Sequence, residues 1–200
     1  MDYNYPQDGK LHTRYHELAK CTPGQIHAVI AERLGQLQPF ENDVTFFGSE
    51  RHGMFEKYIK ANATLPKHFD GLLKSKFGLS LDLSTAKSEQ EIASEMFNGV
   101  VIHGRPDLFG QDWIIDFKTT TNPERFSSSR QTLFYAWLLQ PHGLTITKTY
   151  FLFELWNKDR TEILGYECLA KDITDTMLDE INEWALHRAR LLYAALRSRQ

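Results

Sequence analysis

The chain has 200 residues, 42% of them hydrophobic, so it can bury one substantial core without a disulfide or a structural metal. Its two cysteines lie far apart and lack Cys-x-x-Cys spacing, which excludes a structural zinc site or a four-cysteine iron–sulfur cluster built from this chain alone. The formal net charge of −3 excludes a uniformly basic surface, so affinity for nucleic acid would have to come from local positive clusters.

The beginning of the sequence lacks the basic start and apolar stretch of a signal peptide, and no segment approaches membrane-spanning length. We therefore expect an intracellular, cytoplasmic protein with no membrane contact. One domain spanning residues 1–200 is the expected organisation, with a core over about 46–155 and helical additions at both ends.

The first part of the chain predicts two helices. The first runs from Pro23 to Leu37, and the second runs from about Thr45 to Asn62. Little periodic signal precedes them, and residues 63–90 read as an adaptable insert. His12 and His16 have a spacing that can grip a metal, but no partner follows at a recognisable distance, so a surface pair is favoured.

A hairpin is predicted next, formed by the β-compatible runs Glu91–Phe97 and Val100–Arg105. The dipeptide Asn98-Gly99 between them suits the positive φ angles of a tight type I′ turn. Pro106-Asp107 follows where ladder hydrogen bonding ends, since proline has no N–H to donate. No role is assigned to the neighbouring His103.

The segment Trp113 to Thr119 is a short apolar run that predicts a strand buried on both faces. Side chains alternate along a strand, so Asp116 and Lys118 share one face. Burying unpaired charges costs several kcal/mol, roughly, so these two are expected to meet a cation or a substrate. A turn over residues 109–112 should bring Asp107 beside Asp116, and two close carboxylates favour a bound magnesium or manganese ion.

The remaining elements are a helix from Ser129 to Gln140, strands from Thr145 to Leu155 and from Thr161 to Leu169, and a long C-terminal helix. That last helix has apolar residues at helical spacing, which more often marks core than a partner surface.

Four motifs occur along the chain in a fixed order. They are Gly48-x-x-x-His52-x-x-x-Glu56, Gly104-x-x-Asp107, Asp116-x-Lys118 and Gln131-x-x-x-Tyr135. Each alone is weak, but their joint order and spacing resemble the PD-(D/E)xK nuclease superfamily, specifically its RecB-like exonuclease branch. The resemblance implies a restriction-endonuclease-like α/β fold, with a mixed central β-sheet flanked by helices.

The resemblance also implies a role for each matching residue. The metal, Mg²⁺ or Mn²⁺, would be held by His52, Asp107, Asp116 and the backbone carbonyl of Phe117. Lys118 would orient the attacking water and offset developing charge, because an ammonium stabilises a phosphorane-like transition state. Asp107, Asp116 and Glu56 are catalytic candidates with Lys118.

Substrate contacts are predicted on the helix from Ser129. Gln131, Tyr135 and Arg130 are the candidates there, although a half-buried amphipathic helix explains the first two equally well. His52 and Glu56 could likewise be a solvated helix pair, and Asp116 and Lys118 a surface ion pair.

Positive side chains also gather after the His52 helix and could line a groove or form a solvated basic face. They are Lys57, Lys60, Lys67, His68, Lys74 and Lys76, with Arg125 and Arg130 further along.

The sequence therefore predicts a divalent-metal-dependent deoxyribonuclease, in particular an exonuclease acting on DNA ends or single strands. The alternatives are an endonuclease, an RNA-acting nuclease, or a module that binds nucleic acid or protein without catalysis. A role in DNA repair or recombination, in a phage or mobile element, is a guess from the small format. The sequence leaves open whether the chain forms a homo-oligomer or binds a recombination partner protein.

Overall fold

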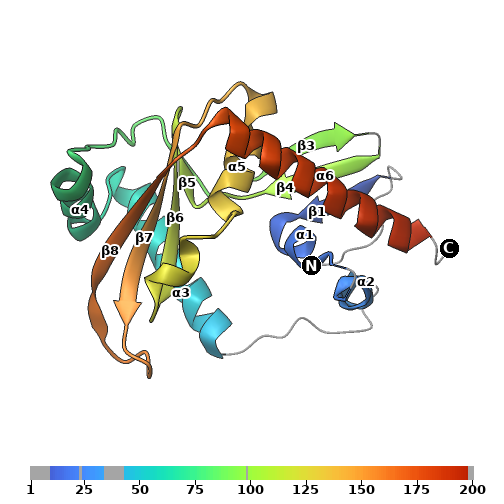
Figure 1. Cartoon of the computed structure of the whole chain (residues 1–200). Helices are drawn as coiled ribbons and strands as arrows, with labels where there is room; N and C mark the ends of the chain where they lie inside the picture. Colours follow the sequence, from blue (N-terminus) through green and yellow to red (C-terminus); the bar gives the residue numbers. More distant parts are fainter. Residues whose placement is uncertain (1–9, 23, 34–42, 98, 198–200) are drawn as a thin grey trace.

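The computed structural model describes residues 10–22, 24–33, 43–97 and 99–197, and these residues build two β-sheets with helices packed around them (Figure 1). The three-stranded sheet has the order β1-β4-β3, and the five-stranded sheet has the order β2-β5-β6-β7-β8. In the first sheet β1 (Leu11–Arg14) runs parallel to β4 (Val100–Gly104), which is antiparallel to β3 (Ile92–Phe97).

The five-stranded sheet is also mixed. Its strands are β2 (Lys87–Ser88), β5 (Leu108–Phe109), β6 (Trp113–Thr120), β7 (Lys148–Trp156) and β8 (Ile163–Asp172). Only the central β6–β7 pair is parallel. The expected restriction-endonuclease-like α/β fold with a mixed β-sheet flanked by helices is confirmed. The predicted hairpin lies in the three-stranded sheet, beside β1, and not in the five-stranded sheet.

In the part of the chain that the structure describes, six α-helices pack around these sheets. They are α1 (Tyr15–Lys20), α2 (Ile26–Arg33), α3 (Asp43–Asn62), α4 (Lys67–Phe77), α5 (Gln131–Leu139) and α6 (Asp175–Arg197). Two short 3₁₀ helices, η1 (Pro123–Phe126) and η2 (Gln140–His142), flank α5. Within these described residues no helix is both long and apolar enough to cross a membrane.

The helix α5 lies at the junction of the two sheets, where it packs against β3, β4, β6 and α6. All of its residues except Gln131 are buried, so this helix has no polar, solvent-exposed face. Gly104 of β4 makes this approach possible, because a Cβ there would lie 2.6 Å from Leu138 Cδ2. The glycine of this motif is therefore explained by packing.

Two hydrophobic clusters lie on opposite faces of β6. The first joins Ile114 to α5, to the buried stripe of α6 and to the three-stranded sheet. The second joins Ile115 and Phe117 to α3, α4 and the far part of the five-stranded sheet. The prediction that β6 is buried on both faces is confirmed, since residues 113–117 are all buried.

Most predicted elements occur within a few residues of their expected bounds. The helix expected at Pro23–Leu37 corresponds to α2, although Pro23 and residues 34–37 lie outside the described residues, as does Asn98 of the expected turn. The hairpin itself is confirmed, with Gly99 at φ +82°. The sequence reading missed β1 and α1, and the insert at 63–90 contains α4 and β2.

Candidate active site

The strand β6 carries Asp116 and Lys118 on one face, and β5 brings Asp107 beside them. Leu108 of β5 pairs with Ile115, so the residue before Leu108 comes opposite the middle of β6. The Phe117 backbone N–H donates a hydrogen bond of 2.7 Å to Asp107 Oδ2. The predicted proximity of the two motif acids is therefore confirmed, although only two residues of β5 form the pairing.

Pro106 marks the point where the chain leaves one sheet and enters the other. Because proline donates no backbone hydrogen bond, the ladder of β4 stops at Gly104, and the chain resumes pairing at Leu108. Asp107 thus sits in the crossing between the sheets, where the cleft opens.

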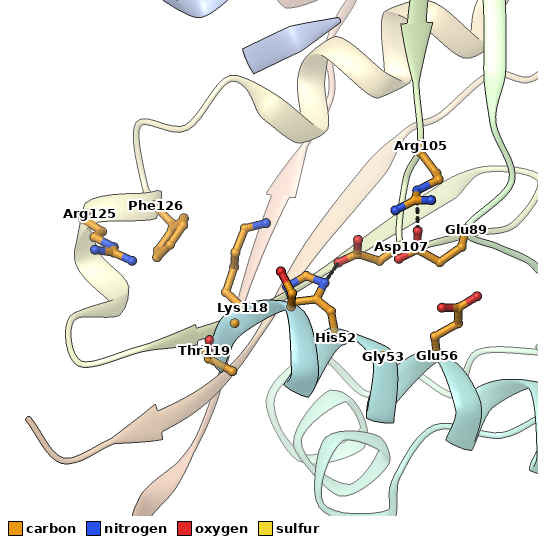
Figure 2. A pocket seen from close by; sticks show the side chains of 12 residues that line it. His52, Gly53, Glu56, Glu89, Arg105, Asp107, Lys118, Thr119, Arg125 and Phe126 are labelled. Carbon is orange, nitrogen blue, oxygen red and sulfur yellow. Dashed lines mark ion pairs between the residues drawn. The ribbon is translucent and has the colours of Figure 1, made fainter. Parts of the chain in front are cut away.

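His52 approaches Asp107 from α3, on the other side of the cleft (Figure 2). Its Nδ1 lies 3.4 Å from Asp107 Oδ2. Its ring meets the Phe117 ring edge-on at 5.1 Å between centroids, and Phe117 in turn stacks on Phe55 at 4.6 Å. The imidazole is therefore oriented by packing as well as by charge.

Burial alone lowers the pKa of His52, but the hydrogen bond and charge of Asp107 together outweigh it, so the net shift is upward. For Asp107 burial raises the pKa, and the contacts with His52, Lys118 and the Phe117 N–H reverse that shift, leaving the pKa below its ordinary value. Both results describe an anionic Asp107.

Glu89, just after β2, completes a group of three potential metal ligands. One ligand atom from each of His52, Glu89 and Asp107 lies within 4.8 Å of the others. Glu89 is held there at φ +51°, which is uncommon for a residue with a side chain, and its N–H donates to the Asp107 carbonyl at 3.1 Å. Its carboxylate also pairs with Arg105 at 2.7 Å (Figure 2).

Asp116 lies outside this group of three and is completely buried. Lys118 Nζ is 2.6 Å from its Oδ2, but neither carboxylate oxygen has a well-directed hydrogen bond from the described residues. Burial raises the pKa of the Asp116 carboxyl to about 6, against the opposing effect of Lys118. A buried carboxylate with unused lone pairs is costly unless something else binds it.

These observations fit a divalent cation. Carboxylate oxygens suit magnesium and manganese, and an imidazole nitrogen in the same set shifts the preference toward manganese. The structure supplies three convergent side chains and, next to them, a buried acid with unsatisfied oxygens. The expected carbonyl ligand of Phe117 lies on the same strand, directly after Asp116.

The cleft around this site has a volume of about 490 Å³. Arg105 lines it on the side of Glu89, and Arg125 and Phe126 of η1 line it beyond Lys118 (Figure 2). Glu56 also lines it, one helical turn after His52, with its carboxylate in an ion pair with Lys60. The opening thus has positive side chains on two sides and acidic side chains at its floor.

Comparison with known proteins matches this architecture. A model of the PD-(D/E)XK nuclease superfamily matches residues 13–198. The chain belongs to the PD-(D/E)XK nuclease superfamily.

Solved structures of exonucleases share the superfamily fold. The chain resembles the alkaline exonuclease LHK-Exo from Laribacter hongkongensis, solved in complex with dAMP, at a TM-score of 0.56 and 14% identity, covering 95% of this chain and 91% of that one. It also resembles a phage related exonuclease from Haemophilus somnus 129PT, at a TM-score of 0.55 and 14% identity, covering 96% and 97%. No curated protein sequence matches the chain.

The motif Gln131-x-x-x-Tyr135 lies on α5, and unlike the other three motifs it contributes no side chain to the lining of the main cleft. Gln131 Nε2 donates to the Tyr135 hydroxyl at 3.1 Å, so the two residues are brought together as their spacing predicts. Burial raises the pKa of Tyr135. Neither residue lines the main cleft, and the Arg130 guanidinium lies 5.8 Å from the Trp184 ring. Their substrate contact stays a prediction.

The predicted basic groove is not part of the cleft in the described residues. Lys60 and Lys74 pair with acids one turn away on their own helices, and the His68 ring stacks on Tyr166 at 3.8 Å. None of the six clustered basic residues lines the opening, which favours a solvated face. Arg125 alone among the predicted basic residues borders the site.

Sequence reasoning missed Glu89 and Arg105. Glu89 belongs to none of the four superfamily motifs, and its left-handed backbone conformation has no signal in the residue type. Arg105 directly precedes Pro106-Asp107, and that adjacency was the only available hint. His12 lies on β1 and His16 on α1, so the two are not one turn apart on a helix, and His12 Nδ1 lies 2.7 Å from His103 Nε2.

Proposed function

We propose that this chain is a divalent-metal-dependent deoxyribonuclease of the RecB-like branch, acting as an exonuclease on DNA ends or single strands. The convergence of His52, Glu89 and Asp107 beside the buried Asp116–Lys118 pair carries the proposal. The likeness to exonuclease structures, one of them solved with dAMP, supports a DNA substrate. We further propose that residues 1–200 act as a single nuclease domain.

In this proposal His52, Glu89 and Asp107 hold Mg²⁺ or Mn²⁺ together with Asp116 and the Phe117 carbonyl. When bound, the cation supplies electrostatic stabilisation of the negative charge that develops on the scissile phosphate. Lys118 keeps its proton, because Asp116 and Asp107 outweigh burial and raise its pKa. Its ammonium can therefore donate to the attacking water and to a phosphate oxygen.

The remaining cleft residues position the strand. Arg105 and Arg125 attract the phosphates from both sides, since neutralising phosphates is the main source of affinity for DNA. Glu56 borders the same opening, where its carboxylate can accept a proton from the attacking water. Gln131, Tyr135 and Arg130 would act from α5, where Tyr135 packs against Gly104 of the Asp107 motif.

The test is cleavage of end-labelled DNA, single- and double-stranded, linear and circular, with manganese, magnesium or chelator. Asp116→Ala should abolish cleavage while the fold and weak DNA affinity remain, and Asp112→Ala, which removes an exposed carboxylate just before the same strand, should stay active. Loss of linear DNA alone supports an exonuclease.

Other outcomes would redirect the assignment. Cleavage of circular DNA would indicate an endonuclease. Preferential cleavage of an RNA of the same sequence would change the proposed substrate from DNA to RNA. Full activity of Asp116→Ala would overturn the assigned metal site. Metal and DNA binding without any cleavage would instead favour a non-catalytic binding module.

A further inference from the structure

A second, smaller pocket of about 60 Å³ adjoins the main cleft and shares Thr119 and Arg125 with it. Its other walls come from two distant parts of the chain: Phe47 on α3, and the end of β7 with the turn that follows, which provide Trp156 and Arg160. Thr120 and Thr121 complete the lining, which contains no acidic side chain. The pocket therefore combines hydroxyl groups, aromatic rings and two guanidinium groups beside the candidate catalytic lysine.

The Trp156 ring is held in place by its neighbours. Its Nε1–H donates to Glu154 Oε2 at 3.3 Å, the Arg51 guanidinium lies 5.3 Å from its ring, and Phe47 meets it edge-on at 4.9 Å. Arg51 is itself fixed by two hydrogen bonds to Glu154, of 2.8 and 2.6 Å. The ring is thus oriented before any ligand arrives, which lowers the entropic cost of stacking against it.

Arg160 is unusual in both its backbone and its charge. It has φ +56°, a conformation that glycine or asparagine adopts at lower cost, and strained positions of this kind cluster at ligand sites. Its guanidinium lies 6.0 Å from the Phe47 ring, and no carboxylate pairs with it in the part of the chain that the structure describes. A structural ion pair such as Arg51–Glu154 does not account for it.

Arg125, in η1, provides the second guanidinium group of the pocket. Its guanidinium lies 4.7 Å from the Phe126 ring, and it too has no carboxylate partner among the described residues. Two guanidinium groups without carboxylate partners and threonine hydroxyls in the same pocket suit a phosphate group, and a fixed indole suits the face of a base.

We infer that this pocket is a non-catalytic subsite for the DNA strand whose scissile phosphate lies in the main cleft. A backbone phosphate would sit between Arg125 and Arg160, with a base against Trp156. The inference rests on the proposed nuclease function. The three residues from Lys118 to Thr121, which directly follows β6, span roughly 10 Å, or about three nucleotides at 3.4 Å each.

The first test measures binding alone. Fluorescence anisotropy of a labelled oligothymidylate is followed with the full chain in chelator, where no cleavage occurs. Arg160→Ala should weaken binding about tenfold and flatten the slope of log affinity against log salt by about 0.7, the effect of one lost phosphate contact on a single strand.

Arg197→Ala is the matched control. Arg197 also lies over an aromatic ring, 4.7 Å from Tyr193, but at the far end of α6. It should change the affinity less than twofold. Equal losses in the two variants, or no loss in Arg160→Ala, would overturn the subsite.

Arg160→Gly separates binding from stability. Glycine removes the guanidinium and relieves the left-handed backbone, so this variant should melt no lower than Arg160→Ala and still bind weakly. If Arg160→Gly bound as tightly as the unaltered chain, the side chain would have no role in binding.

The base contact is tested with Trp156→Leu and an oligonucleotide of abasic residues. The variant should lose about tenfold in affinity for oligothymidylate and nothing for the abasic strand. Equal losses on both strands would overturn stacking on Trp156, and Arg125→Gln then tests the phosphate contact from a separate element. Absence of cleavage by the unaltered chain would overturn the proposed function. The affinity losses of the Arg160 and Trp156 variants would still show that the pocket binds a nucleic-acid strand.

Discussion

Two buried ion pairs of this molecule differ in how completely they are satisfied. Glu17 is 6% exposed and accepts two hydrogen bonds from Arg33, at 2.9 and 2.7 Å. It also accepts hydrogen bonds from the Thr13 hydroxyl and from the backbone N–H of Arg14. Asp116 is 0% exposed, and its only close charge partner is Lys118, with no well-directed hydrogen bond from the described residues.

The difference separates a structural pair from a candidate functional one. Glu17 and Arg33 use their hydrogen-bonding capacity within the protein, joining β1, α1 and α2 around one buried carboxylate. Asp116 has unused hydrogen-bond acceptors behind the cleft, next to Lys118, whose side chain lines the opening. Unsatisfied polar atoms of this kind indicate a site where the missing partner is a ligand.

The largest expected effect comes from the structural pair. Glu17→Gln leaves Arg33 buried without its counter-charge, which costs about 3–5 kcal/mol of unfolding free energy. The melting temperature should fall by roughly 6–20 °C, measured by circular dichroism. Cleavage per folded molecule should not change. The control is Glu32→Gln: Glu32 pairs with Lys20 but is more exposed than Glu17, so this variant should keep the melting temperature of the unaltered chain.

Lys118→Ala should give the opposite result. Turnover should fall about 100- to 1000-fold, the loss typical of removing one electrostatic donor to a transition state. Manganese binding, measured by calorimetry, should remain, because Lys118 is not a metal ligand in this proposal. Lys148→Ala, which breaks an exposed ion pair between Lys148 of β7 and Asp172 of β8, is the control. Loss of manganese binding in Lys118→Ala would assign the lysine a structural role instead.

Metal binding should appear as added stability. Manganese at 100 times its dissociation constant should raise the free energy of unfolding by about 2.7 kcal/mol, or the melting temperature by roughly 5–10 °C. Asp107→Asn should lose most of this gain, and chelator should reverse it in the unaltered chain. An equal gain in Asp107→Asn would place the ion elsewhere.

Glu89→Gln has the smallest expected effect and defines the ligand set. Calorimetry should show manganese affinity lowered at least about tenfold, since a carboxylate ligand is exchanged for a neutral amide. Glu91→Gln changes a nearby acid that pairs with Arg14 and His103, so it should leave the affinity unchanged. Equal affinities in the two variants would limit the ligands to His52, Asp107 and Asp116.

The parts of the fold and site that follow local rules could be predicted from the sequence. The apolar run around Asp116 predicted β6, and Asn98-Gly99 predicted the β3–β4 hairpin, because period and turn chemistry are local properties. The proximity of Asp107 to Asp116 followed from the short turn between them.

The missed features depend on contacts between distant segments. The division into two sheets depends on β1 pairing with β4, about ninety residues later, and β1 itself is too short to give a pattern. Glu89 joins His52 and Asp107 only because the β2–β5 pairing carries it there. Nothing local shows that Pro106 ends one ladder before another begins, so the sequence did not indicate that the strands divide between two sheets.

The crossing at Pro106-Asp107 has a consequence for folding order. The ligand candidates come from α3, from the turn after β2 and from the crossing between the sheets, so they meet only when both sheets have docked. During refolding, the capacity to capture manganese should therefore arise late, after backbone amides within β3 and β4 have become protected from hydrogen exchange. The metal is thus a reporter for assembly of the two halves of the nuclease fold.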